Sequence, residues 1–229
     1  MKFPTLKLNA YFKKNESQKG VFSVWGDFGV GKTTFALQTA LNTAKNGKKI
    51  IYIYTKPNFP SSKIKTLFIN SINYLDKIVF IKPIDFNDLT SIIFNLEFLI
   101  LKNENEDDNQ YRLIVIDSLT DFYRIEVNKE KKERNYVLNY QLNQIIAILS
   151  YINEYYSTDI LIVNESTKKR INDHFIEIQS GGKVMEYWIS FDIKIKRTHK
   201  ISNRQIFLTK HPDNKQLEFI SILTERGFK

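Results

Sequence analysis

Cysteine is absent from this sequence of 229 residues, and histidine occurs only three times. These absences exclude a disulfide framework and a thiolate metal site, and they leave carboxylates as the main ligands for any zinc ion. Glycine and proline are also scarce, with eight and five copies. Because no long linker and no internal repeat divides the chain, we expect a single domain that spans residues 1–229.

The sequence also lacks a long hydrophobic run. Its beginning, MKFPTLKLNAYFKKNESQKG, contains no apolar core of the kind that a signal peptide needs. The longest apolar stretches, such as SIIFNLEFLIL, are too short to span a membrane, and this one includes Glu97. We therefore expect a soluble, cytoplasmic protein with no membrane association.

Negative charge is in short supply relative to positive charge. The chain has 25 Asp and Glu against 34 Lys and Arg, which gives a formal net charge of +9 and an isoelectric point of about 9.4. Such an excess favours polyanions or an acidic membrane surface as partners. It also fits a role in solubility alone, so the charge by itself names no partner.

Strand-like and helix-like segments alternate along most of the chain. Short, continuous, β-branched runs are typical of parallel strands that are buried on both faces. The segments between them have a helical pattern of apolar residues, and Ser61 and Asp85 are predicted N-caps. The expected strands are 21–25, 49–55, 77–81, 112–117 and 159–164, and the expected helices are 32–46, 61–75, 85–102 and 136–156. This alternation predicts an α/β fold with a mainly parallel central sheet and helices on both faces.

The pattern changes after residue 184, where the helix-like segments stop. WISFDIKIKR, RQIFLT and QLEFISIL are predicted strands that are joined by short loops. Neighbouring strands with short connections pair in antiparallel fashion. The sequence therefore predicts antiparallel hairpins at the C-terminal end of the sheet.

The stretch GDFGVGKTT follows the first expected strand and opens the first expected helix. The spacing of its glycines and of Lys32 and Thr33 is that of a phosphate-binding loop. The backbone N–H groups of such a loop converge on phosphate oxygens, and the lysine reaches the β- and γ-phosphates. The residues expected to bind ATP are Gly26, Asp27, Phe28, Gly29, Val30, Gly31, Lys32, Thr33 and Thr34.

A magnesium site is predicted beside this loop. The run RLIVIDS ends an expected buried strand with Asp117, in a pattern similar to a Walker B strand. The Thr33 hydroxyl is expected to bind Mg²⁺, and the Asp117 carboxylate is expected to hold a metal-bound water beside it. Thr33 and Asp117 are therefore the expected metal residues, and ATP and Mg²⁺ are the expected cofactors.

Beyond these two motifs, the sequence resembles the RecA/RadA recombinase ATPases. The resemblance is carried by LIVIDSLTDFYR, NYQLNQIIAILSYINEYYSTDILIVNES and GGKVMEYWISFDIKIKR, and it runs from about residue 20 to the end. The GG…EYW and TKHP forms are most similar to those of archaeal RadB-type paralogs and their KaiC-like relatives. The resemblance implies a RecA-like P-loop core without the family's N-terminal helical domain, which assembles with similar subunits and works with DNA.

Two positions depart from the pattern of this family, and both concern hydrolysis. In the family, the strand after the phosphate loop is followed by a Glu that activates water, whereas this sequence has Lys56. A charged lysine cannot accept a proton at pH 7, although its charge can help to hold phosphate. The family's Asn-Gln pair at the end of the fourth strand is Asn164-Glu165 here, and Glu165 either replaces the missing base or caps the following loop. We therefore expect ATP binding with weak or atypical hydrolysis.

The resemblance also implies a role for Lys210 in the run TKHPD. In RecA-type assemblies, a basic residue on this hairpin reaches the γ-phosphate that the neighbouring subunit holds. Lys210 occupies a similar place and is expected to stabilise charge on the transferring phosphate, so it joins Lys56 and Glu165 as a candidate catalytic residue. The adjacent His211 could assist Lys210, but a lone histidine in a hairpin turn is more often polar surface, and this second interpretation is the one expected.

Two loops that face the filament axis in this family are candidates for binding single-stranded DNA. Lysine and arginine on such loops contact phosphates, which gives affinity without sequence readout. Phe175 either stacks on a base or anchors its loop locally. The expected DNA-binding residues are Lys131, Lys132 and Arg134 in the first loop, and Lys168, Lys169 and Arg170 in the second loop, 165–182.

Two functions fit these observations. The first is an ATP-binding recombinase paralog that binds DNA and modulates homologous recombination and repair. Its expected protein partners are a RecA/RadA-type recombinase, another paralog or further copies of the same chain. The second is a KaiC-like signalling or scaffold ATPase whose partners are proteins. The net positive charge and the basic second loop favour the first, and DNA binding with a steep salt dependence would distinguish the two.

Overall fold

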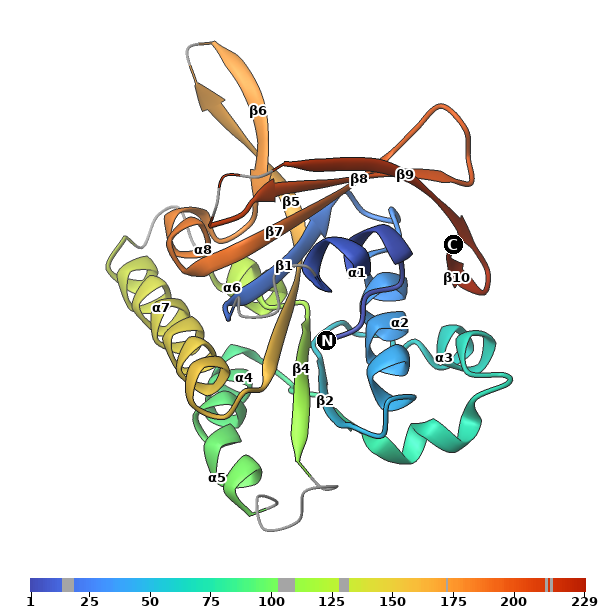
Figure 1. Cartoon of the computed structure of the whole chain (residues 1–229). Helices are drawn as coiled ribbons and strands as arrows, with labels where there is room; N and C mark the ends of the chain where they lie inside the picture. The colour runs from blue at the N-terminus through green and yellow to red at the C-terminus, as the bar shows by residue number, and fades with distance from the viewer. Residues whose placement is uncertain (14–18, 103–109, 128–131, 172, 213, 215) are drawn as a thin grey trace.

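The computed structural model describes residues 1–13, 19–102, 110–127, 132–171, 173–212, 214 and 216–229. A large twisted sheet runs through the middle of the molecule, and helices cover both of its faces (Figure 1). This arrangement confirms the predicted α/β fold with a mainly parallel sheet.

The strands of the described residues form one sheet in the order β10-β9-β8-β7-β1-β5-β4-β2-β3, and β6 pairs with β5 outside this path. The pairs from β7 to β3 are parallel, whereas β7, β8 and β9 pair antiparallel, as predicted. The short strand β10, which was not predicted, pairs antiparallel with β9. The strands are β1 (Val21–Gly26), β2 (Lys49–Tyr54), β3 (Ile78–Ile81), β4 (Tyr111–Asp117), β5 (Asp159–Ile171), β6 (His174–Gln179), β7 (Ile189–Arg197), β8 (Asn203–Lys210), β9 (Leu217–Thr224) and β10 (Gly227–Phe228).

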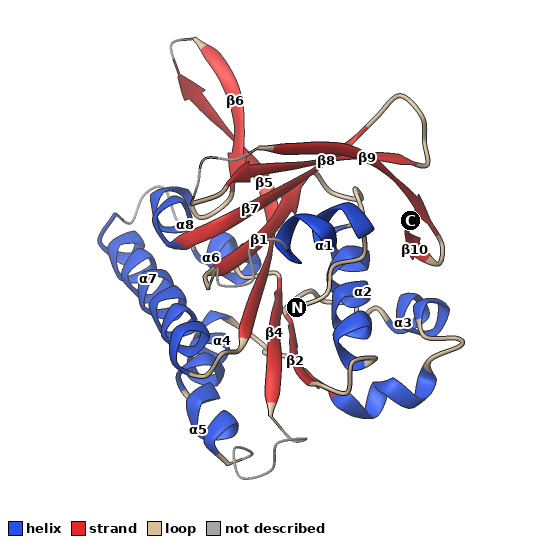
Figure 2. Cartoon of the chain, viewed as in Figure 1, coloured by secondary structure: helices blue, strands red, loops and turns tan. Residues whose placement is uncertain are grey.

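The helices divide between the two faces of the sheet (Figure 2). Helices α1, α2 and α3 lie on one side, and α4, α5, α7 and α8 lie on the other. The helices are α1 (Leu6–Lys13), α2 (Lys32–Ala44), α3 (Ser61–Leu67), α4 (Phe86–Phe94), α5 (Leu96–Leu101), α6 (Thr120–Glu126), α7 (Lys132–Tyr155) and α8 (Gly182–Trp188), with a 3₁₀ helix at Ile72–Lys77.

Each central strand contributes side chains to two hydrophobic cores. In β2, Ile50 and Tyr52 pack under α2, whereas Ile51 and Ile53 pack under α4 and α7. Side chains alternate between the faces of a strand, and both faces of this sheet are covered. The central strands are therefore continuous apolar runs, and this composition is the reason that the sequence predicted their positions.

Two expected helices are shorter or broken in the structure. The helix expected at 85–102 is divided into α4 and α5 at Asn95, whose side-chain amide donates to the Ser91 carbonyl oxygen at 2.8 Å. Such a local side-chain bond competes with the helical backbone pattern. The helix expected at 61–75 ends at Leu67 and is followed by a separate 3₁₀ helix.

The two predicted N-caps have different outcomes. Asp85 is the N-cap of α4, and its carboxylate accepts a hydrogen bond from the Asp88 backbone at 2.8 Å. The prediction for Ser61 is wrong, because Pro60 is the N-cap and Ser61 is the first helical residue. Proline lacks a backbone donor, and this deficit has little consequence at the beginning of a helix.

The segment expected as a second loop forms a β-hairpin instead. Strand β5 continues past the sheet to residue 171 and pairs antiparallel with β6, and the resulting hairpin projects from one end of the molecule (Figure 1). Neither face of the projecting part is covered by a helix, so its strands need no apolar run. The mostly polar sequence therefore did not predict them as strands.

The interpretation of His211 as polar surface is wrong. Its side chain is 3% exposed and lies among aromatic rings, with ring-centroid distances of 5.2 Å to Phe191 and 5.5 Å to Tyr11. Helix α1, which was not predicted from the sequence, brings Tyr11 to this position.

Within the described ranges, no helix is long and apolar enough to cross a membrane.

Candidate functional site

The phosphate-binding loop joins the central strand β1 to helix α2, and two of its glycines are required by the backbone. Gly26 ends β1 with φ 149°, and Gly31 precedes α2 with φ 106°. A Cβ atom at Gly26 would lie 2.2 Å from the carbonyl oxygen of Ile195, and one at Gly31 would lie 2.7 Å from Leu223 Cδ2. Glycine is therefore required at these two positions, because a Cβ atom has no room there and because φ is positive.

Two arginines from the C-terminal strands donate hydrogen bonds to backbone carbonyl oxygens of the loop. The Arg204 Nε atom donates to the carbonyl oxygen of Val30 at 2.9 Å, and Arg197 Nη2 donates to that of Phe28 at 3.0 Å. Val30 is buried, whereas the Phe28 side chain is 85% exposed at the tip of the loop. Neither arginine is indicated by the sequence motif, because both lie far along the chain from the loop that they support.

Lys32, the first residue of α2, is 4% exposed and points back into the loop. Its ammonium donates to the carbonyl oxygens of Gly26 and Asp27 at 2.9 and 2.7 Å, and to Glu165 Oε2 at 2.6 Å. An ammonium has three N–H donors, so these contacts engage all of them. Burial lowers the pKa of Lys32, and the Glu165 carboxylate opposes this shift in part.

Asp117 lies at the carboxyl end of β4 and is fully buried. Its Oδ2 atom accepts a hydrogen bond from the Tyr52 hydroxyl at 3.0 Å. In the described part of the chain, no well-placed hydrogen-bond donor reaches its Oδ1 atom. Burial raises the pKa of Asp117, while Lys56 and the neighbouring Thr33 hydroxyl lower it in part. The fold therefore brings the two predicted metal residues, Thr33 and Asp117, together.

Glu165 and Lys56 complete a chain of alternating charges in this site. Glu165 lies at the end of the part of β5 that pairs with β1, opposite Gly26. Its carboxylate contacts Lys32 at 2.6 Å and Lys56 at 3.3 Å, and Lys56 lies 3.6 Å from Asp117 Oδ1. The order Lys32, Glu165, Lys56, Asp117 thus places each charge beside its opposite.

Lys56 is a cation in this environment. Burial lowers the pKa of Lys56, but Asp117, Glu165 and Asp121 outweigh burial and raise the pKa above its ordinary value. The ammonium therefore keeps its proton at neutral pH and cannot act as a general base. Its side chain is 22% exposed, so it faces the site without being free in solvent.

A cavity of about 420 Å³ opens beside the phosphate-binding loop. A neighbouring cavity of about 770 Å³ follows the carboxyl ends of β2 and β3, and Lys56 lines both. Four residues that line the smaller cavity were not predicted from the sequence, namely Tyr54, Pro60, Lys63 and Leu223. Tyr54 ends β2, and Pro60 and Lys63 follow it, so their position after a buried strand could have indicated them. Leu223 lies on β9 and reaches the cavity only because of the fold.

The predicted catalytic residue Lys210 lies apart from the other two. It ends β8, donates to the carbonyl oxygen of Glu186 and lines a third cavity, of about 710 Å³, beside α8. It does not line the cavity at the phosphate-binding loop. A contact with a nucleotide on a neighbouring subunit stays a prediction.

The predicted DNA-binding residues of the second segment lie on the projecting hairpin. Lys168, Lys169 and Arg170 occupy successive positions on β5 and are exposed. Because side chains alternate along a strand, Lys169 points to the opposite face from the other two. Arg170 pairs with Asp173, and Phe175, on β6, is 69% exposed. Phe175 is therefore not a buried packing anchor.

The described residues of the first predicted DNA-binding segment are helical. Lys132 and Arg134 lie in the first turn of α7, so their expected place in a loop is wrong. Arg134 contacts Glu126 of α6 at 3.1 Å, and this ion pair reduces its net charge toward a ligand. Lys131, the third predicted residue, lies outside the described residues.

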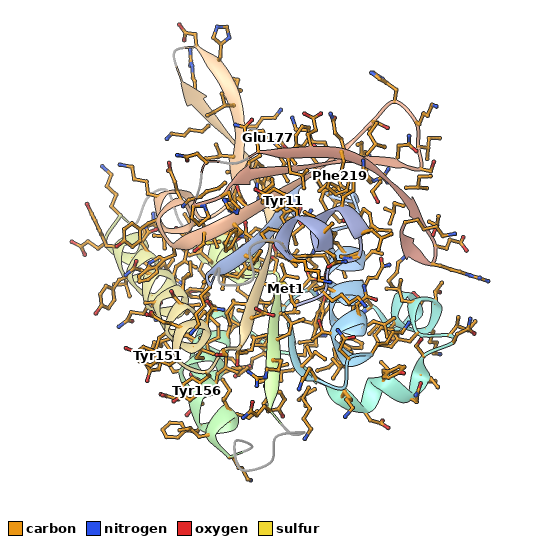
Figure 3. All side chains as sticks on the ribbon, in the orientation of Figure 1. Met1, Tyr11, Tyr151, Tyr156, Glu177 and Phe219 are labelled. Carbon is orange, nitrogen blue, oxygen red and sulfur yellow. The ribbon has the colours of Figure 1, made fainter. Side chains whose placement is uncertain are left out.

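The base of the hairpin is tied to both the phosphate-binding loop and the main sheet. The Ser166 hydroxyl donates to the Asp27 carboxylate. On the other strand, Glu177 forms an ion pair of 2.7 Å with Lys194, whose ammonium also lies 4.3 Å from the centre of the Trp25 ring. Figure 3 marks Glu177 near the point where the hairpin leaves the sheet. The hairpin is thus held at its base while its tip projects.

Comparison with known proteins agrees with this geometry. A family model described as Rad51 matches residues 12–229. A protein of Methanococcus maripaludis strain C5, named DNA repair and recombination protein RadB, is 32% identical over 205 residues, which cover 89% of this chain and 88% of that protein. Proteins of the same name from Methanobrevibacter smithii and Methanocaldococcus jannaschii are each 26% identical, and they cover 92% and 93% of this chain and 88% and 94% of their own lengths. The chain therefore belongs to the Rad51 family.

Proposed function

We propose that this protein is an ATP-binding recombinase paralog that acts in homologous recombination and DNA repair. The observation that carries the proposal is the assembly of Lys32, Thr33 and the buried carboxylate of Asp117 around one phosphate-binding loop. The RadB names of its relatives support a role in recombination over the alternative of a KaiC-like signalling or scaffold ATPase.

The site fits a nucleotide with Mg²⁺. Lys32, Thr33 and the loop backbone would hold the phosphates, and Thr33 and Asp117 would hold the metal ion with its waters. Magnesium in phosphate sites commonly uses one or two protein oxygens beside phosphates and water. The buried Asp117 Oδ1 atom, which lacks a well-placed donor among the described residues, matches this demand. When bound, the metal ion would supply charge stabilisation for the phosphate oxygens.

Hydrolysis is expected to be slow, because neither Lys56 nor Glu165, the two candidate bases among the described residues, is free to accept a proton from water. Lys56 is held as a cation by its carboxylate neighbours. Both carboxylate oxygens of Glu165 already have a lysine partner, Oε2 with Lys32 and Oε1 with Lys56, so an attacking water would have to compete with these two contacts. A positioned general base contributes roughly 10²–10⁴-fold to rate. The protein would therefore work mainly through nucleotide binding.

The projecting hairpin is the proposed DNA surface. Lys168, Lys169 and Arg170 are exposed on it, and Phe175 offers a ring for stacking on an unpaired base. The net charge of +9 supports attraction to a polyanion. We propose single-stranded DNA as the ligand, and a RecA/RadA-type recombinase, a paralog or a further copy of the chain as the protein partner. Lys210 would act across the boundary between such subunits.

One experiment tests this function. ATP binding and turnover should be measured with Mg²⁺, with and without single-stranded DNA, and with a partner recombinase. We expect ATP and DNA binding with slow turnover, and a change in strand exchange when the protein is added to the recombinase. A protein that binds neither nucleotide nor DNA would refute the proposal. Nucleotide binding without DNA binding, or DNA binding without a salt dependence, would favour the KaiC-like alternative.

A further inference from the structure

The three donors of the Lys32 ammonium are already engaged. Two acceptors are backbone carbonyl oxygens of the loop, and the third is the carboxylate of Glu165, at 2.6 Å. A phosphate oxygen can therefore bind Lys32 closely only by replacing one of these three contacts. Glu165 is the only one of the three acceptors that carries a full negative charge, so an entering phosphate repels it most.

The position of Glu165 determines which phosphate it meets. The lysine of a phosphate-binding loop reaches the β- and γ-phosphates, and the metal ion of such a site bridges oxygens of the same two phosphates. Glu165 lies between Lys32 and Lys56, and Lys56 in turn contacts the metal-side residue Asp117 at 3.6 Å. The carboxylate is thus on the metal side of Lys32, where a third phosphate would be added.

We propose that Glu165 is a specificity-determining residue that lowers the affinity for nucleoside triphosphates relative to nucleoside diphosphates. The inference rests on the proposed nucleotide-binding function of the same site. Glu165 neutralises Lys32 and Lys56 before a nucleotide arrives, so the γ-phosphate must either displace this carboxylate or lie beside it. A diphosphate meets this conflict less, because its β-phosphate can reach Lys32 but it has no third phosphate to place beside the Glu165 carboxylate.

The substitution Glu165→Gln isolates the effect. Glutamine keeps the length of the side chain and an oxygen acceptor for Lys32, but it carries no charge. With Glu165 present, the charges of Lys32, Lys56, Glu165 and Asp117 sum to zero, and the substitution leaves one net positive charge. Like charges at about 4 Å in partly buried surroundings repel strongly enough to change an affinity tenfold or more.

The test is to measure dissociation constants of the full chain for ADP and for a non-hydrolysable ATP analogue, both with Mg²⁺. We expect Glu165→Gln to tighten binding of the triphosphate analogue about tenfold or more, and to change ADP binding by less than about threefold. The matched control is Glu177→Gln, which removes one negative charge from the adjoining hairpin, where Glu177 pairs with Lys194. We expect it to leave the ratio of the two constants unchanged.

The possible results distinguish the role of Glu165 from the nucleotide-binding function on which it rests. An unchanged ratio in a folded Glu165→Gln variant, or the same gain for both nucleotides, overturns the inference and leaves nucleotide binding intact. Failure of the wild type to bind either nucleotide overturns both. If Glu165→Gln does not fold, Glu165→Asp answers the question, because its shorter side chain withdraws the charge from Lys32. A triphosphate gain with Glu165→Asp supports the inference, and its absence overturns it.

Discussion

Two substitutions, Lys56→Glu and Glu165→Gln, should together convert this nucleotide-binding site into a faster ATPase. The Lys56 ammonium lies 3.3 Å from Glu165 and 3.6 Å from Asp117, and its side chain is largely buried. The single substitution Lys56→Glu would replace this cation with an anion between two carboxylates. Removing one partner of a buried ion pair typically costs about 3–5 kcal/mol, so we expect a loss of folding free energy of this size in the nucleotide-free protein.

Adding Glu165→Gln should relieve most of this cost. The double variant Lys56→Glu/Glu165→Gln has one carboxylate fewer than the single variant, and it matches the Glu and Gln that the RecA/RadA pattern has at these positions. A general base is then available beside the metal residues. Because such a base contributes roughly 10²–10⁴-fold, we expect ATP turnover at least about 100-fold above the wild type.

Phosphate release at saturating ATP and Mg²⁺, with single-stranded DNA present, measures the rate, and urea denaturation measures stability. Lys56→Gln serves as the control, since it removes the cation without supplying a base, and it should not accelerate turnover. If the folded double variant binds ATP but is no faster than Lys56→Gln, the assignment of position 56 is mistaken. If the wild type is already fast and Glu165→Gln stops it while ATP binding persists, Glu165 is the base.

Three further predictions follow from the same structure. Lys32→Ala should abolish ATP binding without unfolding the domain, and unchanged affinity for a labelled ATP analogue would show that this loop is not the nucleotide site. Neutralising Lys168, Lys169 and Arg170 together should weaken DNA binding for all sequences and reduce the salt slope by about one for each lost phosphate contact; an unchanged slope would place the DNA surface elsewhere. Arg204→Met should lower the free energy of unfolding by about 1.5–3 kcal/mol, because its bond to the phosphate-binding loop is charge-assisted; a denaturation midpoint equal to that of the wild type would contradict this role.

Local sequence alone determined the nucleotide motif and most of the sheet. The glycines of the phosphate-binding loop, Lys32 and Asp117 could be located because each follows directly on a buried strand, and such strands are continuous apolar runs. The antiparallel C-terminal strands were predicted from strand-like runs that short loops join. These features depend on neighbours within a few residues, so the order of amino acids is enough to predict them.

Tertiary structure decided the electrostatics of the site and the form of the hairpin. Lys32 and Glu165 are 133 positions apart, and Lys56 and Glu165 are 109 apart, so their ion pairs exist only because β1, β5, β4 and β2 lie side by side. Arg204 reaches the loop from 174 positions away by the same means. The β5 half of the hairpin, residues 165–171, is almost entirely polar because no helix covers its projecting part. Charges that pair over a long sequence separation leave no periodic pattern in the sequence. For this reason the ion pair between Lys32 and Glu165 could be seen only in the folded chain.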